Sequence, residues 1–121
     1  MSEMEKYNAI VEKSKEFALR IIRLSRYLSE ERHEYVLSRQ ILRSGTSVGA
    51  NIREATRGQS RADFYTKLTV ALKEADETAY WLELLHESGY IGKDAFESMY
   101  QDCQELIRLL TAITRTLRRN P

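Results

Sequence analysis

The chain has 121 residues, of which 42% are hydrophobic and 31% are charged, and its formal net charge is +1. This composition predicts one domain, residues 1–121, with a single core. No apolar run approaches the roughly 18 residues that a membrane-spanning helix needs, and residues 1–8 lack the apolar core of a signal peptide. The single cysteine excludes an intrachain disulfide, and we expect a cytoplasmic protein that does not contact a membrane.

The first predicted helix covers about residues 5–28, where apolar or small residues recur at alternating steps of three and four. A series with this spacing forms one stripe along a helix, as in helices that pack about 20° apart. The stripe consists of Tyr7, Ile10, Ser14, Phe17, Ile21, Leu24 and Leu28.

The second predicted helix covers about residues 34–57, after a break that begins with Ser29, a favourable N-cap residue. Two of its interior positions are Gly45 and Gly49, each of which costs about 1 kcal/mol relative to alanine. We therefore expect the backbone of another helix to approach this face closely. Spacing leaves open whether that helix belongs to the same bundle or to a second subunit.

The third predicted helix follows a C-terminal cap at Gly58, starts with the capping pair Ser60 and Asp63, and ends before Gly89. The last predicted helix opens at residues 92–94 and carries a stripe of the same spacing. Four such helices joined by short breaks predict an all-α fold, an antiparallel up-down-up-down four-helix bundle.

Many large apolar residues lie outside these stripes, which favours a second buried surface and therefore a homo-oligomer. A wider core stripe in a monomer is the alternative interpretation. The residues concerned are Leu19, Ile22, Tyr65, Leu72, Tyr80, Trp81, Leu84, Tyr100, Ile107 and Leu109.

Charge is distributed unevenly along the chain. Residues 32–61 hold six Arg against two Glu, whereas residues 62–87 hold six acidic residues against two Lys. The basic segment could contact phosphates, pair with the acidic helix of a neighbouring subunit, or form a solvated surface with salt bridges. Arg53, Arg57 and Arg61 follow each other at steps of four, but Gly58 is expected to end the helix before Arg61. The candidates for nucleic-acid contact are Arg39, Arg43, Arg53, Arg57 and Arg61.

Residues suited to catalysis are few. Two Glu-x-x-His spacings, Glu30 to His33 and Glu83 to His86, have the form used by di-iron bundles, but both fall near turns at one end of the predicted bundle. The first helix supplies no core-facing Glu to complete such a site. Cys103 lies in an apolar stripe, where a buried, inert thiol is expected. We therefore expect no catalytic residue, metal or cofactor; a carboxylate-bridged metal enzyme is a distant alternative.

Residues 39–55, RQILRSGTSVGANIREA, resemble the signature of the 23S ribosomal RNA intervening-sequence protein family, also called the four helix bundle protein family. The similarity continues through residues 61–65 and 87–91, and so extends over nearly the whole chain. Within the motif, Asn51 is expected to fix helix register and Glu54 to pair with Arg53 or Arg57. The four positions assigned a structural role are Ser47, Gly49, Asn51 and Glu54.

The resemblance implies further properties that spacing does not show. Family members are encoded within ribosomal RNA genes or as separate genes, assemble as ring-like homopentamers, and have no assigned catalytic residues. A related fold serves diversity-generating retroelements beside a nucleic acid and a reverse transcriptase. The sequence thus favours a non-enzymatic homo-oligomeric bundle that binds RNA, DNA or a nucleoprotein. The alternative is a protein-protein scaffold without nucleic-acid contact.

Overall fold

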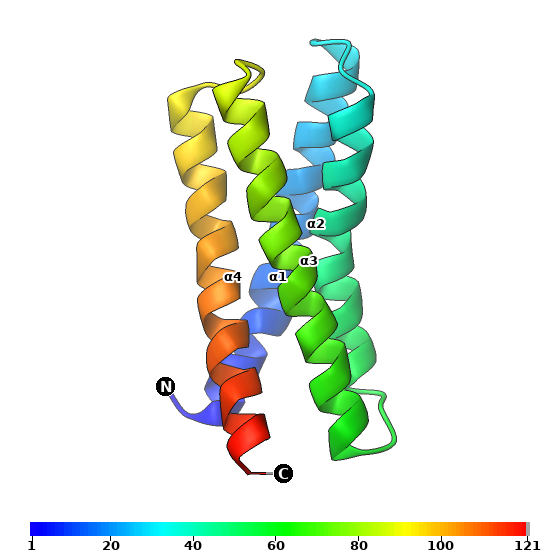
Figure 1. Cartoon of the computed structure of the whole chain (residues 1–121), viewed down its shortest axis with the longest axis vertical. Helices are drawn as coiled ribbons and strands as arrows, with labels where there is room; N and C mark the ends of the chain where they lie inside the picture. The colour runs from blue at the N-terminus through cyan, green and yellow to red at the C-terminus, as the bar shows by residue number, and fades with distance from the viewer. Residues whose placement is uncertain (121) are drawn as a thin grey trace.

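The structure, a computed structural model, describes residues 1–120. Four helices run alternately up and down, α1 (Glu3–Glu30), α2 (Val36–Ala55), α3 (Arg61–Glu87) and α4 (Lys93–Arg119) (Figure 1). Each helix packs against the next one in the chain, and α1 also packs against α4. This arrangement confirms the predicted antiparallel four-helix bundle.

The ends of α1 and α3 follow from local capping. The Ser2 side chain accepts a hydrogen bond from the Glu5 amide at 3.1 Å, and the Glu5 carboxylate accepts one from the Ser2 amide at 3.1 Å. The Ser60 side chain accepts the Asp63 amide at 3.1 Å, as predicted, while the Asp63 carboxylate accepts the amide of Gln59 at 3.2 Å. Gly89 has a φ of +86°, a left-handed conformation that favours glycine and ends α3.

The break between α1 and α2 lies later than the sequence predicts. The hydroxyl of Ser29 donates to the Arg26 carbonyl within α1, so this serine does not start a helix. α2 begins at Val36. The side chain of its N-cap residue, Tyr35, makes no capping hydrogen bond, and the Glu34 carboxylate accepts the Ser38 amide at 2.8 Å instead. At its other end α2 stops at Ala55, two residues before the predicted end.

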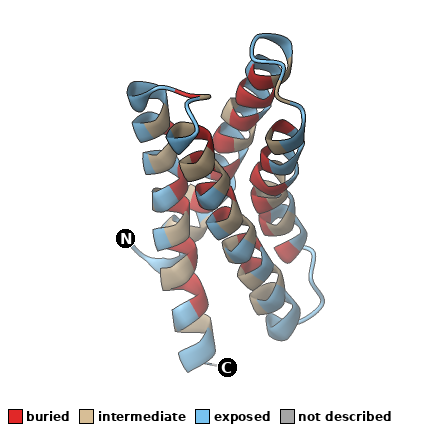
Figure 2. Cartoon of the chain, turned by 45° about the horizontal axis from the view of Figure 1, so that its top comes forward, coloured by how far each residue is buried: buried red, intermediate tan, exposed pale blue. Residues whose placement is uncertain are grey.

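The predicted stripes form the core. Figure 2 shows the buried positions of the helices turned toward the inside of the bundle. Ile10, Phe17 and Ile21 of α1 are at most 1% exposed. Two polar contacts are buried with them: Ser25 with Ser38 at 3.0 Å between their hydroxyls, and Thr78 with Ser44 at 2.9 Å. Each of these four hydroxyls has a partner, so none of the four carries the cost of an unmet hydrogen bond.

The glycines of α2 pack against α1 of the same chain. A Cβ on Gly45 would lie 2.7 Å from Ile21 Cγ1, and a Cβ on Gly49 would lie 3.3 Å from Ser14 Oγ. The close approach predicted from the sequence is therefore confirmed, and its partner lies inside the bundle.

Candidate nucleic-acid interface

Four arginines project from the outer face of α2 and the turn that follows it. Arg39, Arg43, Arg53 and Arg57 recur with the spacing of one helix face and are all exposed. Between them on this face lie only the small residues Thr46 and Ala50. We call the four arginines the α2 ridge.

One member of the α2 ridge has partners within the chain. Arg43 pairs with Glu74 of α3 at 3.2 Å and also with Glu77. Arg39, Arg53 and Arg57 make no ion pair with any residue between 1 and 120. These three guanidinium groups therefore present the uncompensated positive charge of the ridge.

Arg61 lies apart from the α2 ridge. It starts α3 beyond the turn at Gly58, and its Nε donates to the Asn120 carbonyl at 2.9 Å. The structure thus places this predicted contact residue beside the end of α4.

A lysine that the sequence analysis missed lies beside the end of the α2 ridge. Lys67 of α3 lines a pocket of about 700 Å³ together with Arg53 and Arg57, and it pairs with Glu54 at 2.9 Å. The turn at Gly58 brings the start of α3 beside the end of α2. Because Lys67 follows Gly58 closely in the sequence, its position near that turn could have indicated that it lies beside Arg53 and Arg57. The hollow at the end of α2 is therefore lined by three cations together with the carboxylates of Glu54 and Asp63.

Comparison with known proteins identifies the family. The sequence model described as the 23S rRNA-intervening sequence protein matches residues 6–112. The chain belongs to this family.

A crystal structure of a protein of unknown function from the S23 ribosomal protein family of Bacteroides thetaiotaomicron VPI-5482 is 55% identical to this chain. The alignment covers 91% of this chain and 98% of that one, with a TM-score of 0.89. Among curated proteins, no sequence matches.

The residues that carry the resemblance to the 23S rRNA-intervening sequence family act mainly within α2. The Ser47 hydroxyl donates to the Arg43 carbonyl at 2.6 Å, and Asn51 Nδ2 donates to the Ser47 carbonyl at 2.8 Å. Asn51 thus bonds its own helix, and the structure gives no support to a role in register between helices. Glu54 pairs with Lys67, so the predicted pairing with a neighbouring arginine of α2 is wrong.

His86 and Glu83 have structural contacts, and Cys103 is buried. His86 stacks on Phe96 with ring centroids 4.5 Å apart, and Glu83 accepts the Tyr100 hydroxyl at 2.8 Å. That hydrogen bond raises the pKa of Tyr100 because it favours the protonated phenol.

Among residues 1–120, no group of three or more His, Cys, Asp and Glu side chains could hold a metal ion. Burial raises the pKa of the Cys103 thiol to about 12, so at neutral pH it is protonated.

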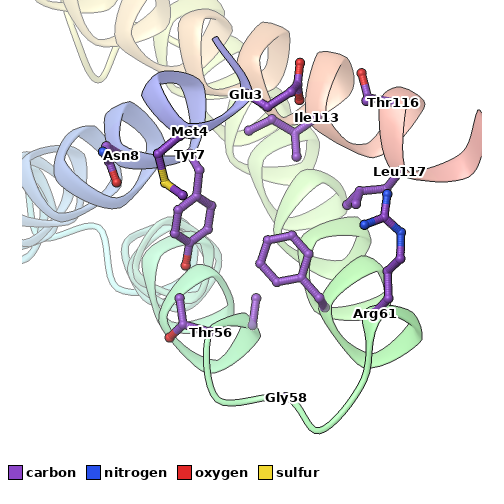
Figure 3. A pocket seen from close by; sticks show the side chains of 12 residues that line it. Glu3, Met4, Tyr7, Asn8, Thr56, Gly58, Arg61, Ile113, Thr116 and Leu117 are labelled. Atoms are coloured by element: carbon purple, nitrogen blue, oxygen red, sulfur yellow. The ribbon is translucent and has the colours of Figure 1, made fainter. Parts of the chain in front are cut away.

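A second pocket opens at the end of the bundle where both chain ends lie (Figure 3). It has a volume of about 600 Å³ and takes residues from all four helices. The Tyr7 ring packs against Phe64 with centroids 5.5 Å apart, and its buried hydroxyl has no hydrogen-bond partner within residues 1–120. Burial raises the pKa of this phenol.

No helix of the described chain is both long and apolar enough to cross a bilayer.

Proposed function

We propose that the chain is a non-enzymatic, homo-oligomeric cytoplasmic protein that binds nucleic acid, RNA or DNA, through the α2 ridge. The observation that carries this proposal is the set of uncompensated cations at Arg39, Arg53 and Arg57 on one exposed face. Guanidinium groups form forked hydrogen bonds to phosphate, and they remain charged at every physiological pH. Contacts of this kind give affinity without sequence preference.

Salt dependence of binding tests the proposal. Each phosphate contact on duplex DNA contributes roughly 0.9 to the slope of log K against log salt. We expect Arg39→Gln/Arg57→Gln to flatten that slope by about 2, measured by fluorescence anisotropy with labelled duplex DNA and structured RNA. The matched control is Arg108→Gln/Arg115→Gln on exposed positions of α4, a helix that does not contact α2. If both double variants bind like the parent, the ridge is not the interface.

A scaffold without nucleic-acid contact is the second candidate function. The ion pairs of Arg43 with Glu74 and Glu77 favour it, because they show that an arginine of the ridge can serve packing between α2 and α3. This candidate predicts no binding to either polymer, even at low salt.

Exposed apolar side chains support the homo-oligomeric part of the proposal. Leu19, Ile22 and Tyr80 are 47%, 37% and 53% exposed, whereas Leu109 is buried in the core of the single chain. The family resemblance favours a homopentamer, so light scattering is expected to give about five times 14.1 kDa. A ring would repeat the α2 ridge in every subunit and strengthen weak phosphate contacts by multivalency. A mass of one subunit at micromolar concentration would contradict the oligomer.

A further inference from the structure

The outer surface between α1 and α2 holds a groove with a floor of small residues, which we call the α1/α2 groove. Its volume is about 350 Å³, and Gly49 and Ala50 lie in it beside Val11, which is 41% exposed. Lys15 and Arg53 line the same groove and supply positive charge on both helices. Because its floor lacks long side chains, a large side chain from another molecule can reach close to the backbone here.

The outer face of α3 carries a row of exposed and half-buried residues, which we call the α3 ridge. It comprises Val70, Lys73, Glu77, Tyr80 and Leu84. These residues follow each other at steps of three and four, so they lie on one helix face. Tyr80 is 53% exposed, and its ring contacts Trp81 with centroids 5.3 Å apart, which restrains its orientation. A restrained, exposed aromatic side chain is the kind of residue that anchors protein interfaces.

We propose that the α1/α2 groove of one copy is filled by the α3 ridge of a second copy, with Tyr80 over Ala50. The proposal rests on the homo-oligomeric part of the proposed function and identifies the two faces that meet. Tyrosine suits this position because its apolar ring can cover the small-residue floor while its hydroxyl reaches polar groups at the edge.

Charge complementarity identifies the occupant as this chain. The groove offers Lys15 and Arg53, whereas α3 exposes Asp76 and Glu87 near its ridge. Neither acid makes an ion pair within residues 1–120, so both can face the groove, and together they outnumber Lys73, the cation of the ridge. A contact of groove with groove would bring like charges together, which disfavours a symmetric pairing.

A contact of groove with ridge also has a consequence for assembly. Each copy keeps one free groove and one free ridge, so further copies add until the rotation closes a ring. Arg39 and Arg57 do not line the groove. Phosphate contact by these members of the α2 ridge is therefore compatible with the assembled state.

Two substitutions test the proposal. Ala50→Glu places an acidic residue in the groove, and Tyr80→Arg places a cation on the α3 ridge; both positions are exposed and both new residues favour helices. Each variant alone is expected to lose assembly and to run as a single 14.1 kDa subunit in analytical ultracentrifugation. An equimolar mixture is expected to regain at least a dimer, because one variant keeps an intact groove and the other an intact ridge. Gln101→Arg, at an exposed position of α4, is the matched control that keeps the parent mass.

The outcomes separate this inference from the proposed function. If Tyr80→Arg assembles like the parent, or if the mixture stays at one subunit, the pairing of groove with ridge is wrong even though the oligomer stands. If the parent itself is a single subunit, the oligomer and this inference both fail, while nucleic-acid binding is decided by the salt titration. Circular dichroism shows whether each variant is folded. If Ala50→Glu or Tyr80→Arg unfolds, the same test is made with Val11→Glu in the groove and Val70→Arg on the ridge.

Discussion

α1 packs against its two neighbours by different means. Toward α2 the contact is close and made by small residues: Gly45 receives Ile21, and Ser25 exchanges hydrogen bonds with Ser38 in the interior. Toward α4 the rim of the contact is made by exposed ion pairs, such as that of Lys13 with Glu105 at 2.7 Å.

The difference indicates where the bundle resists change. A buried contact of small residues depends on shape, and even one added methylene must displace a neighbour. Exposed ion pairs hold two long side chains at a cost in entropy and contribute little to the free energy of unfolding. We therefore expect substitutions between α1 and α2 to have larger effects than substitutions between α1 and α4.

The largest effect is expected from Gly45→Leu. Leucine would gain about 1 kcal/mol in helix propensity, but its side chain would overlap Ile21, because even a Cβ would lie 2.7 Å from Ile21 Cγ1. We expect a net loss of about 1–3 kcal/mol in the free energy of unfolding, measured by urea denaturation at one protein concentration. Gln40→Leu, at an exposed position of the same helix outside the α1/α2 groove, is the control and should change little. A Gly45→Leu variant that melts higher than the parent would contradict the close contact.

The residues that the sequence predicted best are those governed by local or periodic rules. The stripe of α1 and the capping serine of α3 follow from spacing and from hydrogen bonds within one turn. Gly45 could be recognised as a site of close approach because glycine inside a helix needs a compensating gain. The choice of α1 as its neighbour required the structure, since spacing carries no information on which helix faces which.

The candidate site was predicted less completely because its partners come from another helix. Glu54 was expected to pair along α2, but it pairs with Lys67 of α3, across the turn between the helices. Arg43 was expected to be available for phosphate, whereas Glu74 and Glu77 of α3 bind it. Such pairings depend on the rotation of two helices about their axes, which charge patterns along one chain do not define.

A smaller effect is expected from the serine pair between α1 and α2. Ser25→Ala removes a buried hydroxyl and leaves Ser38 with fewer partners, so we expect a loss of about 1 kcal/mol in the free energy of unfolding. The double variant Ser25→Ala/Ser38→Ala should lose less than the sum of the two single variants, because both polar groups are then absent. Urea denaturation of all four proteins gives the coupling. Strictly additive losses would show that the two hydroxyls do not depend on each other.

The smallest effect is expected where α1 meets α4. Arg20 pairs with Asp102 at 2.6 Å and donates to the Ser98 hydroxyl at 3.0 Å, yet its side chain is 34% exposed and that of Asp102 is 48% exposed. Water and salt therefore screen the pair, and Arg20→Gln should lower the free energy of unfolding by only about 0.2–1 kcal/mol. The loss should shrink further at 1 M salt, whereas the loss from Gly45→Leu should persist because steric overlap is not screened. Arg23→Gln removes the same charge from an exposed position of α1 that makes no ion pair within residues 1–120, and it corrects for the change in net charge. If Arg20→Gln costs as much as Gly45→Leu in high salt, the two neighbours of α1 are held equally firmly and the contrast between them is wrong.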